Sequence, residues 1–182
     1  MLDLTLTAAP ALGGYDKRFG DTRLVEMANL PLTSIALPLG MSLNMAQAVK
    51  DAFGLDWPDV GRATQSGDAT LAMLSPDQAL LIGPEVALHD TPLANHGYLT
   101  DQTDVWVALD LEGPGRFAAM ERLCPVDLAP GHFGTGHFAR TVMEHMGAVV
   151  LWRDADAFRL LSARSSAGSF LHAVETSLNY TR

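Results

Sequence analysis

The stretch VWVALDLEGPGRFAAMERLCPVDL, residues 105–128, constrains the fold most, because a strand, a turn and a helix follow one another within it. Apolar residues occupy every second position over 105–111, which is typical of a β-strand. Gly113 and Pro114 then favour a sharp turn into a helix, since proline is tolerated in the first helical turn. Pro125 cannot continue that helix. The stretch therefore predicts a unit of strand, turn and helix.

An earlier stretch predicts the same unit. Residues Ser34–Leu39 alternate as a strand does, and Gly40 provides the turn. The next apolar residues repeat at helical spacing as far as Phe53, with Ser42 as the expected N-cap and Gly54 as the C-terminal cap. Two such units in one chain indicate an internal duplication.

Each unit continues into a pair of short apolar runs that flank a turn, and these hairpins are predicted at residues 69–82 and 148–161. A helix with one apolar face then follows from about Ser165, and a shorter counterpart is expected at about residues 84–93. The order β-α-β-β-α, repeated, predicts an α+β fold in which helices lie on one side of each small sheet.

The expected domain organisation follows from this pattern. Scattered glycine, proline and charge indicate an irregular N-terminal arm over residues 1–31. Residues 32–182 should form a single duplicated domain, with lobes at about 32–100 and 101–182.

Composition excludes several classes of partner. A formal net charge of −9 argues against nucleic acid and anionic membranes, which both require a basic face. No run approaches the roughly 20 apolar residues that cross a bilayer. The single cysteine, Cys124, cannot form an internal disulfide and lies on a predicted apolar stripe, so we expect a packed thiol and a cytoplasmic protein.

No catalytic, cofactor-binding or metal-binding residue is predicted. His132, His137 and His145 are spaced by five and eight residues, which matches no zinc motif. The EGPG segment at 112–115 lacks the further glycines of a dinucleotide loop and the lysine of a Walker loop, so a structural turn is expected.

The glycine-rich loop from Pro130 to Phe138 is the predicted partner contact. Its candidate contact residues are Phe133, His137 and Phe138, because aromatic side chains on a flexible loop are stabilised when a partner buries them. The alternative is that both phenylalanine rings already pack on the chain's own sheet, in which case replacing them would damage folding.

Three segments follow one another in the second half: DVWVALDLEGPGRF (104–117), ERLCPVDLAPGHFGTGHFART (121–141) and VVLWRDADAFRLLSARS (149–165), and an amphipathic helix comes after them. With these segments the chain resembles the gamma subunit of heterotetrameric sarcosine oxidase, over about 104–179 and more weakly from Gly20.

The resemblance implies an accessory subunit of a flavoenzyme that oxidatively demethylates sarcosine to glycine. It implies larger flavoprotein subunits as partners, and FAD, FMN, NAD and tetrahydrofolate held by the complex, with none bound by this chain alone. It also implies the folate-binding fold of aminomethyltransferases and tRNA-modifying GTPases, without catalytic residues to carry over. Two other readings remain open: a stand-alone folate-binding or aminomethyl-transfer protein, and a homo-oligomer unrelated to any flavoenzyme.

Overall fold

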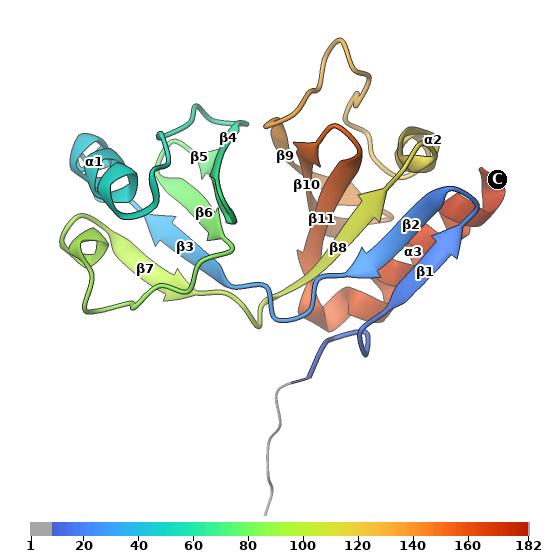
Figure 1. Ribbon diagram of the computed structural model, residues 1–182, viewed down its shortest axis with the longest axis horizontal. Helices are drawn as coiled ribbons and strands as arrows, with labels where there is room; N and C mark the ends of the chain where they lie inside the picture. Colours follow the sequence, from blue (N-terminus) through green and yellow to red (C-terminus); the bar gives the residue numbers. More distant parts are fainter. Residues whose placement is uncertain (1–8, 182) are drawn as a thin grey trace, which may run out of the picture.

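The computed structural model describes residues 9–181 and contains two antiparallel sheets (Figure 1). Sheet A has six strands in the order β1-β2-β8-β11-β10-β9: β1 (Asp16–Phe19), β2 (Thr22–Glu26), β8 (Trp106–Glu112), β11 (Ala157–Ala163), β10 (Met146–Asp154) and β9 (Phe138–Met143). Sheet B has five, in the order β4-β5-β6-β3-β7: β4 (Ala63–Ser66), β5 (Ala69–Ser75), β6 (Gln78–Ile82), β3 (Leu32–Ala36) and β7 (Tyr98–Asp101). The helices are α1 (Ser42–Phe53), η1 (Pro92–Asn95), α2 (Arg116–Glu121), η2 (Arg164–Ser166) and α3 (Ala167–Tyr180). The α+β fold class is confirmed.

The two sheets repeat one another strand by strand. The order β4-β5-β6-β3 in sheet B corresponds to β9-β10-β11-β8 in sheet A. Each central hairpin closes with a two-residue turn, and each carries an irregularity at the same place, between Met73 and Ser75 in one and between Trp152 and Asp154 in the other. The predicted duplication is therefore confirmed, down to the position of a bulge.

Each sheet is completed by a strand that leads into the other sheet. Strand β2 pairs with β8 in sheet A, and the chain then crosses to β3 in sheet B. Strand β7 pairs with β3 in sheet B, and the chain then crosses back to β8 in sheet A. Figure 1 shows both crossings side by side at the base of the molecule. The two halves are thus joined twice by the backbone.

Three apolar clusters form the core. One lies between sheet A and the helices α2 and α3, and a second lies between sheet B and α1. The third joins the inner faces of the two sheets, and it includes Leu32 and Ile82 from sheet B with Leu151 and Leu161 from sheet A. We infer from this shared cluster that the two lobes belong to one domain.

The expected irregular arm of residues 1–31 contains two strands instead, and its residues 1–8 lie outside the described part of the chain. The hairpin of β1 and β2 buries only a few apolar side chains, among them Phe19 and Leu24, so its sequence shows no apolar period. The segment before it is held by the Glu26 carboxylate, which accepts hydrogen bonds from the backbone N–H groups of Leu12, Gly14 and Tyr15. Side-chain bonding of this kind leaves no periodic pattern in a sequence.

Other expected elements differ at their ends. Helix α1 and its Gly54 C-terminal cap are confirmed, but the residue at the N-cap is Met41 and Ser42 is already helical. The helix expected near residues 84–93 is reduced to η1. Strands β4 and β7 are not predicted, because both are short edge strands with mostly polar side chains.

A close backbone contact fixes the turn after β8. Gly113 has φ +101°, and a Cβ there would come within 2.4 Å of the Asp21 carbonyl oxygen and 3.2 Å of Thr22 Cα. The Gly115 N–H donates a hydrogen bond to Thr22 Oγ1 at 2.9 Å. The turn therefore packs directly against the backbone of the β1–β2 hairpin.

We expect Gly113→Ala to lower the free energy of unfolding by more than about 2 kcal/mol, because the methyl group meets backbone atoms and φ is unfavourable. Urea denaturation measures this. Gly168→Ala in α3 is the control: no atom lies within 4 Å of its added Cβ, so a stabilisation of up to about 1 kcal/mol is expected. Equal effects of both changes would contradict this account of the turn.

The hairpin is tied to α3 by a polar contact. Tyr15 Oη donates to Glu175 Oε1 at 2.6 Å, and Lys17 Nζ donates to the same oxygen at 2.8 Å. These two bonds hold the pKa of Glu175 below its usual value, with the Lys17 bond as the larger cause. Burial, followed by the bond to Glu175, raises the pKa of Tyr15.

A carboxyl group with a lowered pKa in the folded state stabilises the fold above its unfolded pKa, and this contribution is lost as the pH falls through its folded pKa. We therefore expect Glu175→Gln to reduce stability at neutral pH by less than about 1 kcal/mol. The difference from wild type should shrink on acidification below the ordinary glutamate pKa. Melting temperatures across pH test this, with exposed Glu121→Gln as control. A difference that grows on acidification would contradict it.

Candidate functional site

The loop predicted to contact a partner is packed into the chain itself. Phe133 is 6% exposed and belongs to the cluster under α2 and α3, whereas Phe138 is 3% exposed and lies between the two sheets. The expectation that these two rings are available to a partner is thus corrected in favour of the alternative arrangement. Partner contact by His137, which is partly exposed, stays a prediction.

The loop is held by backbone hydrogen bonds to both sheets. The Ala63 N–H donates to the Gly136 carbonyl at 2.7 Å, and the Phe138 N–H donates to the Gly61 carbonyl at 3.0 Å. On the other side, the Trp152 N–H donates to the His137 carbonyl at 3.0 Å. The loop therefore joins β4 of sheet B to β10 of sheet A, which explains why its aromatic rings point inward.

The three histidines weighed as a metal site, His132, His137 and His145, do not form one. His132 bonds to the Asp127 carboxylate, and this bond holds the pKa of Asp127 below its usual value. The His137 ring packs edge-on against Phe133 at 5.2 Å, and its pKa is lowered by burial and by nearby Arg62. Within residues 9–181, no group of three or more metal-ligating side chains is arranged to hold a metal ion.

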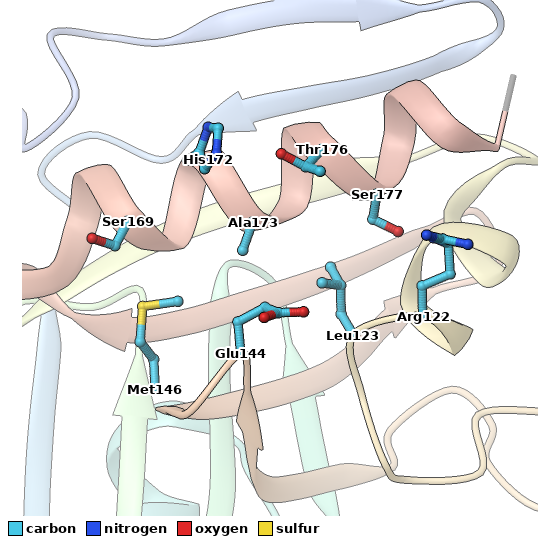
Figure 2. Close-up of a pocket in the computed structure, with 9 residues that line it drawn as sticks. All are labelled: Arg122, Leu123, Glu144, Met146, Ser169, His172, Ala173, Thr176 and Ser177. Carbon is cyan, nitrogen blue, oxygen red and sulfur yellow. The ribbon is translucent and has the colours of Figure 1, made fainter.

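A pocket of about 520 Å³ lies between α3, the end of α2 and the β9–β10 turn. Figure 2 shows Arg122 at one end and Met146 at the other, with Leu123 and Glu144 facing the helix between them. The helix contributes His172 and small side chains, among them Ala173, because its bulky apolar residues face the core. The pocket offers a cation, an anion and hydroxyl groups to a small polar molecule or to the side chains of a partner.

The turn beside this pocket has an unusual backbone. Met143 and Met146 pair at the end of the β9–β10 hairpin, and the two residues between them, Glu144 and His145, have φ +46° and +68°. Two-residue hairpin turns with two positive φ values strongly prefer Asn-Gly, so Glu-His is a strained choice. Sequence reasoning missed this feature, because Glu-His is not a hairpin signal.

A buried ion cluster occupies the inner face of sheet A. Asp110 is fully buried, and its two oxygens accept hydrogen bonds from Arg159 at 2.7 and 2.8 Å. Arg153 bonds to the same carboxylate and also approaches Glu112 at 3.5 Å. Guanidinium groups occupy both oxygens, so the Asp110 carboxylate is engaged in contacts that hold the sheet together.

Cys124 is buried, as its place on an apolar stripe predicts. Burial raises the pKa of its thiol, although hydrogen bonds involving Val126 and Thr141 act in the opposite direction. A thiol with a raised pKa is a weak nucleophile.

None of the helices in residues 9–181 has the length and apolar character needed to cross a membrane.

We expect Phe138→Ala to lower the free energy of unfolding by about 3–5 kcal/mol, because it opens a cavity where the two sheets meet. Chemical denaturation of the full chain measures the change. Val142→Ala on the same strand is the matched control, since Val142 is exposed and its loss should change stability by less than about 0.5 kcal/mol. Near-normal stability of the Phe138 variant would restore the partner-contact reading.

Comparisons with known proteins show which sequences and folds this chain resembles. No family model matches the chain. A curated relative from Corynebacterium sp. (strain P-1), sarcosine oxidase subunit gamma, is 30% identical over 130 residues, which are 65% of this chain and 62% of the relative's length. The matched segment thus spans less than two thirds of that protein.

Two solved structures share the fold. A chain of the heterotetrameric sarcosine oxidase from Corynebacterium sp. U-96, solved with pyrrole 2-carboxylate, matches with a TM-score of 0.77 at 22% identity, covering 88% of this chain and 85% of that one. The glycine cleavage system aminomethyltransferase T from Bartonella henselae matches with a TM-score of 0.56 at 14% identity, covering 85% of this chain and 45% of that protein. The resemblance to sarcosine oxidase gamma subunits and the fold shared with an aminomethyltransferase, both predicted from the sequence, are therefore confirmed.

Proposed function

We propose that this chain is an accessory, non-catalytic gamma subunit of a heterotetrameric sarcosine oxidase. In this proposal, larger flavoprotein subunits carry out the oxidative demethylation of sarcosine to glycine. The observation that carries the proposal is the 30% identity of this chain to a curated gamma subunit. In support, this chain also shares its fold with a chain of a heterotetrameric sarcosine oxidase.

The chemistry of the described residues supports an accessory role. The buried Asp110 carboxylate is held by two arginines, and the Ser177 hydroxyl donates to the Ala119 carbonyl at 2.7 Å although it borders the pocket. The buried Glu26 carboxylate is bonded to three backbone N–H groups. These polar groups stabilise the fold, and a group committed in this way is not available for acid–base work on a substrate.

We further propose that the flavins, NAD and tetrahydrofolate are bound by the larger subunits. A ligand bound between the two lobes would need space between the sheets. That space is filled by the apolar side chains of the shared cluster. The aminomethyltransferase that shares this fold is also more than twice as long as the part that matches.

Co-expression with the neighbouring genes tests the proposal. We expect the tagged full-length chain to co-purify with larger subunits in a fixed ratio, and the purified material to show flavin absorbance and to oxidise sarcosine. The same chain expressed alone is the control and should carry no flavin. If no flavoprotein accompanies the tagged chain, the assignment as a gamma subunit is wrong.

Calorimetry with tetrahydrofolate separates this function from the alternative of a stand-alone folate-binding or aminomethyl-transfer protein. We expect no binding by the isolated full-length chain. Low-micromolar binding by that chain would favour the alternative.

A further inference from the structure

One turn of the chain presents apolar side chains to solvent. We name residues Pro38–Leu43, which run from the connection after β3 into the first turn of α1, the apolar turn. Leu39 is fully exposed (103%) and Leu43 is 83% exposed, while Met41 is 38% exposed. Single exposed apolar residues are common on protein surfaces, but a group of them on one short segment marks an interaction site.

The apolar turn is ordered by hydrogen bonds. The Met41 N–H donates to the Pro38 carbonyl at 3.1 Å, which closes a four-residue turn with Leu39 and Gly40 at its centre. Gly40 has φ +82°, the value that a type II turn needs at its third residue. Nothing lies within 4 Å of a Cβ added to Gly40, so the glycine serves the turn rather than packing. The exposed position of Leu39 is therefore set by the backbone.

Both ends of the apolar turn are anchored to the fold. The Leu37 N–H donates to the Asp77 carbonyl at 2.8 Å, and the Met45 N–H donates to the Met41 carbonyl at 3.0 Å. A surface held in this way loses little conformational entropy when it binds, which favours affinity. The arrangement is thus suited to insertion into a preformed site.

The charge of the surrounding sequence indicates the chemistry of the partner. From Met27 to Val49 the chain has no acidic, basic or histidine residue, although it contains 21 acidic and 12 basic residues in all. A surface that faces only water usually carries charge, whereas the centre of a protein interface is depleted in charged residues. Exposed Asp77 on the β5–β6 turn borders the apolar turn, so the matching partner surface is apolar where it meets the leucines.

An aromatic side chain lies next to the apolar turn. Tyr98 is 71% exposed and pairs with Ala36, the last residue of β3 before the turn. Figure 1 shows β7 and the start of α1 at the same end of sheet B, on the side away from sheet A. Tyrosine is enriched in interfaces, because its ring is apolar and its hydroxyl can form a hydrogen bond.

We propose that the apolar turn inserts into an apolar hollow on a larger subunit of the complex, with Leu39 and Leu43 as its main contacts and Tyr98 at the edge. This inference rests on the proposed function and names the surface through which it acts. It places the interface on the lobe of sheet B, far from the glycine-rich loop that the sequence suggested.

Competition for incorporation tests the proposal. Wild-type chain and the variants Leu39→Ser or Leu43→Ser, carrying different tags, are co-expressed with the same larger subunits, and the ratio of the tags in the purified complex is measured. We expect the purified complex to contain roughly tenfold or more wild-type chain than variant, because each variant can no longer bury a leucine in the partner. Each isolated variant should melt as wild type does, since these side chains touch little of the fold. The control is Val142→Ser, which also replaces an exposed apolar side chain with serine but lies on the lobe of sheet A. This variant should be incorporated as well as wild type.

The outcomes separate the two proposals. If wild-type chain assembles and both leucine variants are incorporated equally well, the apolar turn is not the interface and the accessory function stands. If wild-type chain assembles with no larger subunit, the proposed function fails and this inference fails with it. If the isolated chain is a dimer in light scattering and Leu39→Ser makes it a monomer, the apolar turn binds a second copy of the chain and not a larger subunit, which overturns the proposal. Should Leu39→Ser lower the melting temperature, Leu39→Lys, which keeps a long side chain, repeats the test.

Discussion

The packing of the two sheets on each other is the interaction on which the rest of this structure depends. Each sheet contains a strand that leads directly into the other sheet, β2 in sheet A and β7 in sheet B, so the chain crosses between the sheets at β2–β3 and again at β7–β8. These crossings bring the inner faces together, and residues such as Leu80 and Leu151 fill the space between them. Because the inner faces are covered in this way, the helices must lie on the outer faces, and any surface open to a partner must lie on a helix, at a sheet edge or at a turn. The apolar turn and the pocket beside α3 both satisfy this condition.

A covered inner face also determines what its polar residues can do. Asp110 lies in the middle of β8 on that face, and an unpaired carboxylate there would be strongly destabilising. Arg159, directly opposite on β11, and Arg153 on β10 supply the compensating charge. Removing one partner of such a cluster is expected to destabilise more than the intact cluster stabilises, since it leaves a charge buried and unpaired. The cluster therefore makes the register of three neighbouring strands depend on a set of polar contacts, and it adds specificity to a face that is otherwise apolar.

Much of this arrangement could be predicted from local periods. The strand at β8, the helix α1 with Gly54 at its end, and the two central hairpins all contain apolar residues at the spacing that their geometry requires, and the duplication follows from their order. The β1–β2 hairpin could not be predicted in this way, because it is stabilised by Glu26, by the contact of Gly113 with Asp21 and by the bonds to Glu175, which lie far apart in sequence. The burial of Asp110 is hidden for the same reason: its partner Arg159 is 49 residues away.

The two glycine-containing apolar loops show why local sequence could not locate the surface available to a partner. The loop that ends in Phe138 and the apolar turn around Leu39 both combine glycine with large apolar side chains, so by composition either one could be buried or exposed. What separates them is their position relative to the second sheet. The first loop lies between β4 and β10, where its backbone bonds to both, and its rings fill the core. The second lies at the end of sheet B away from sheet A, where no second sheet is present to cover it. Its apolar side chains are therefore left for a surface outside the chain.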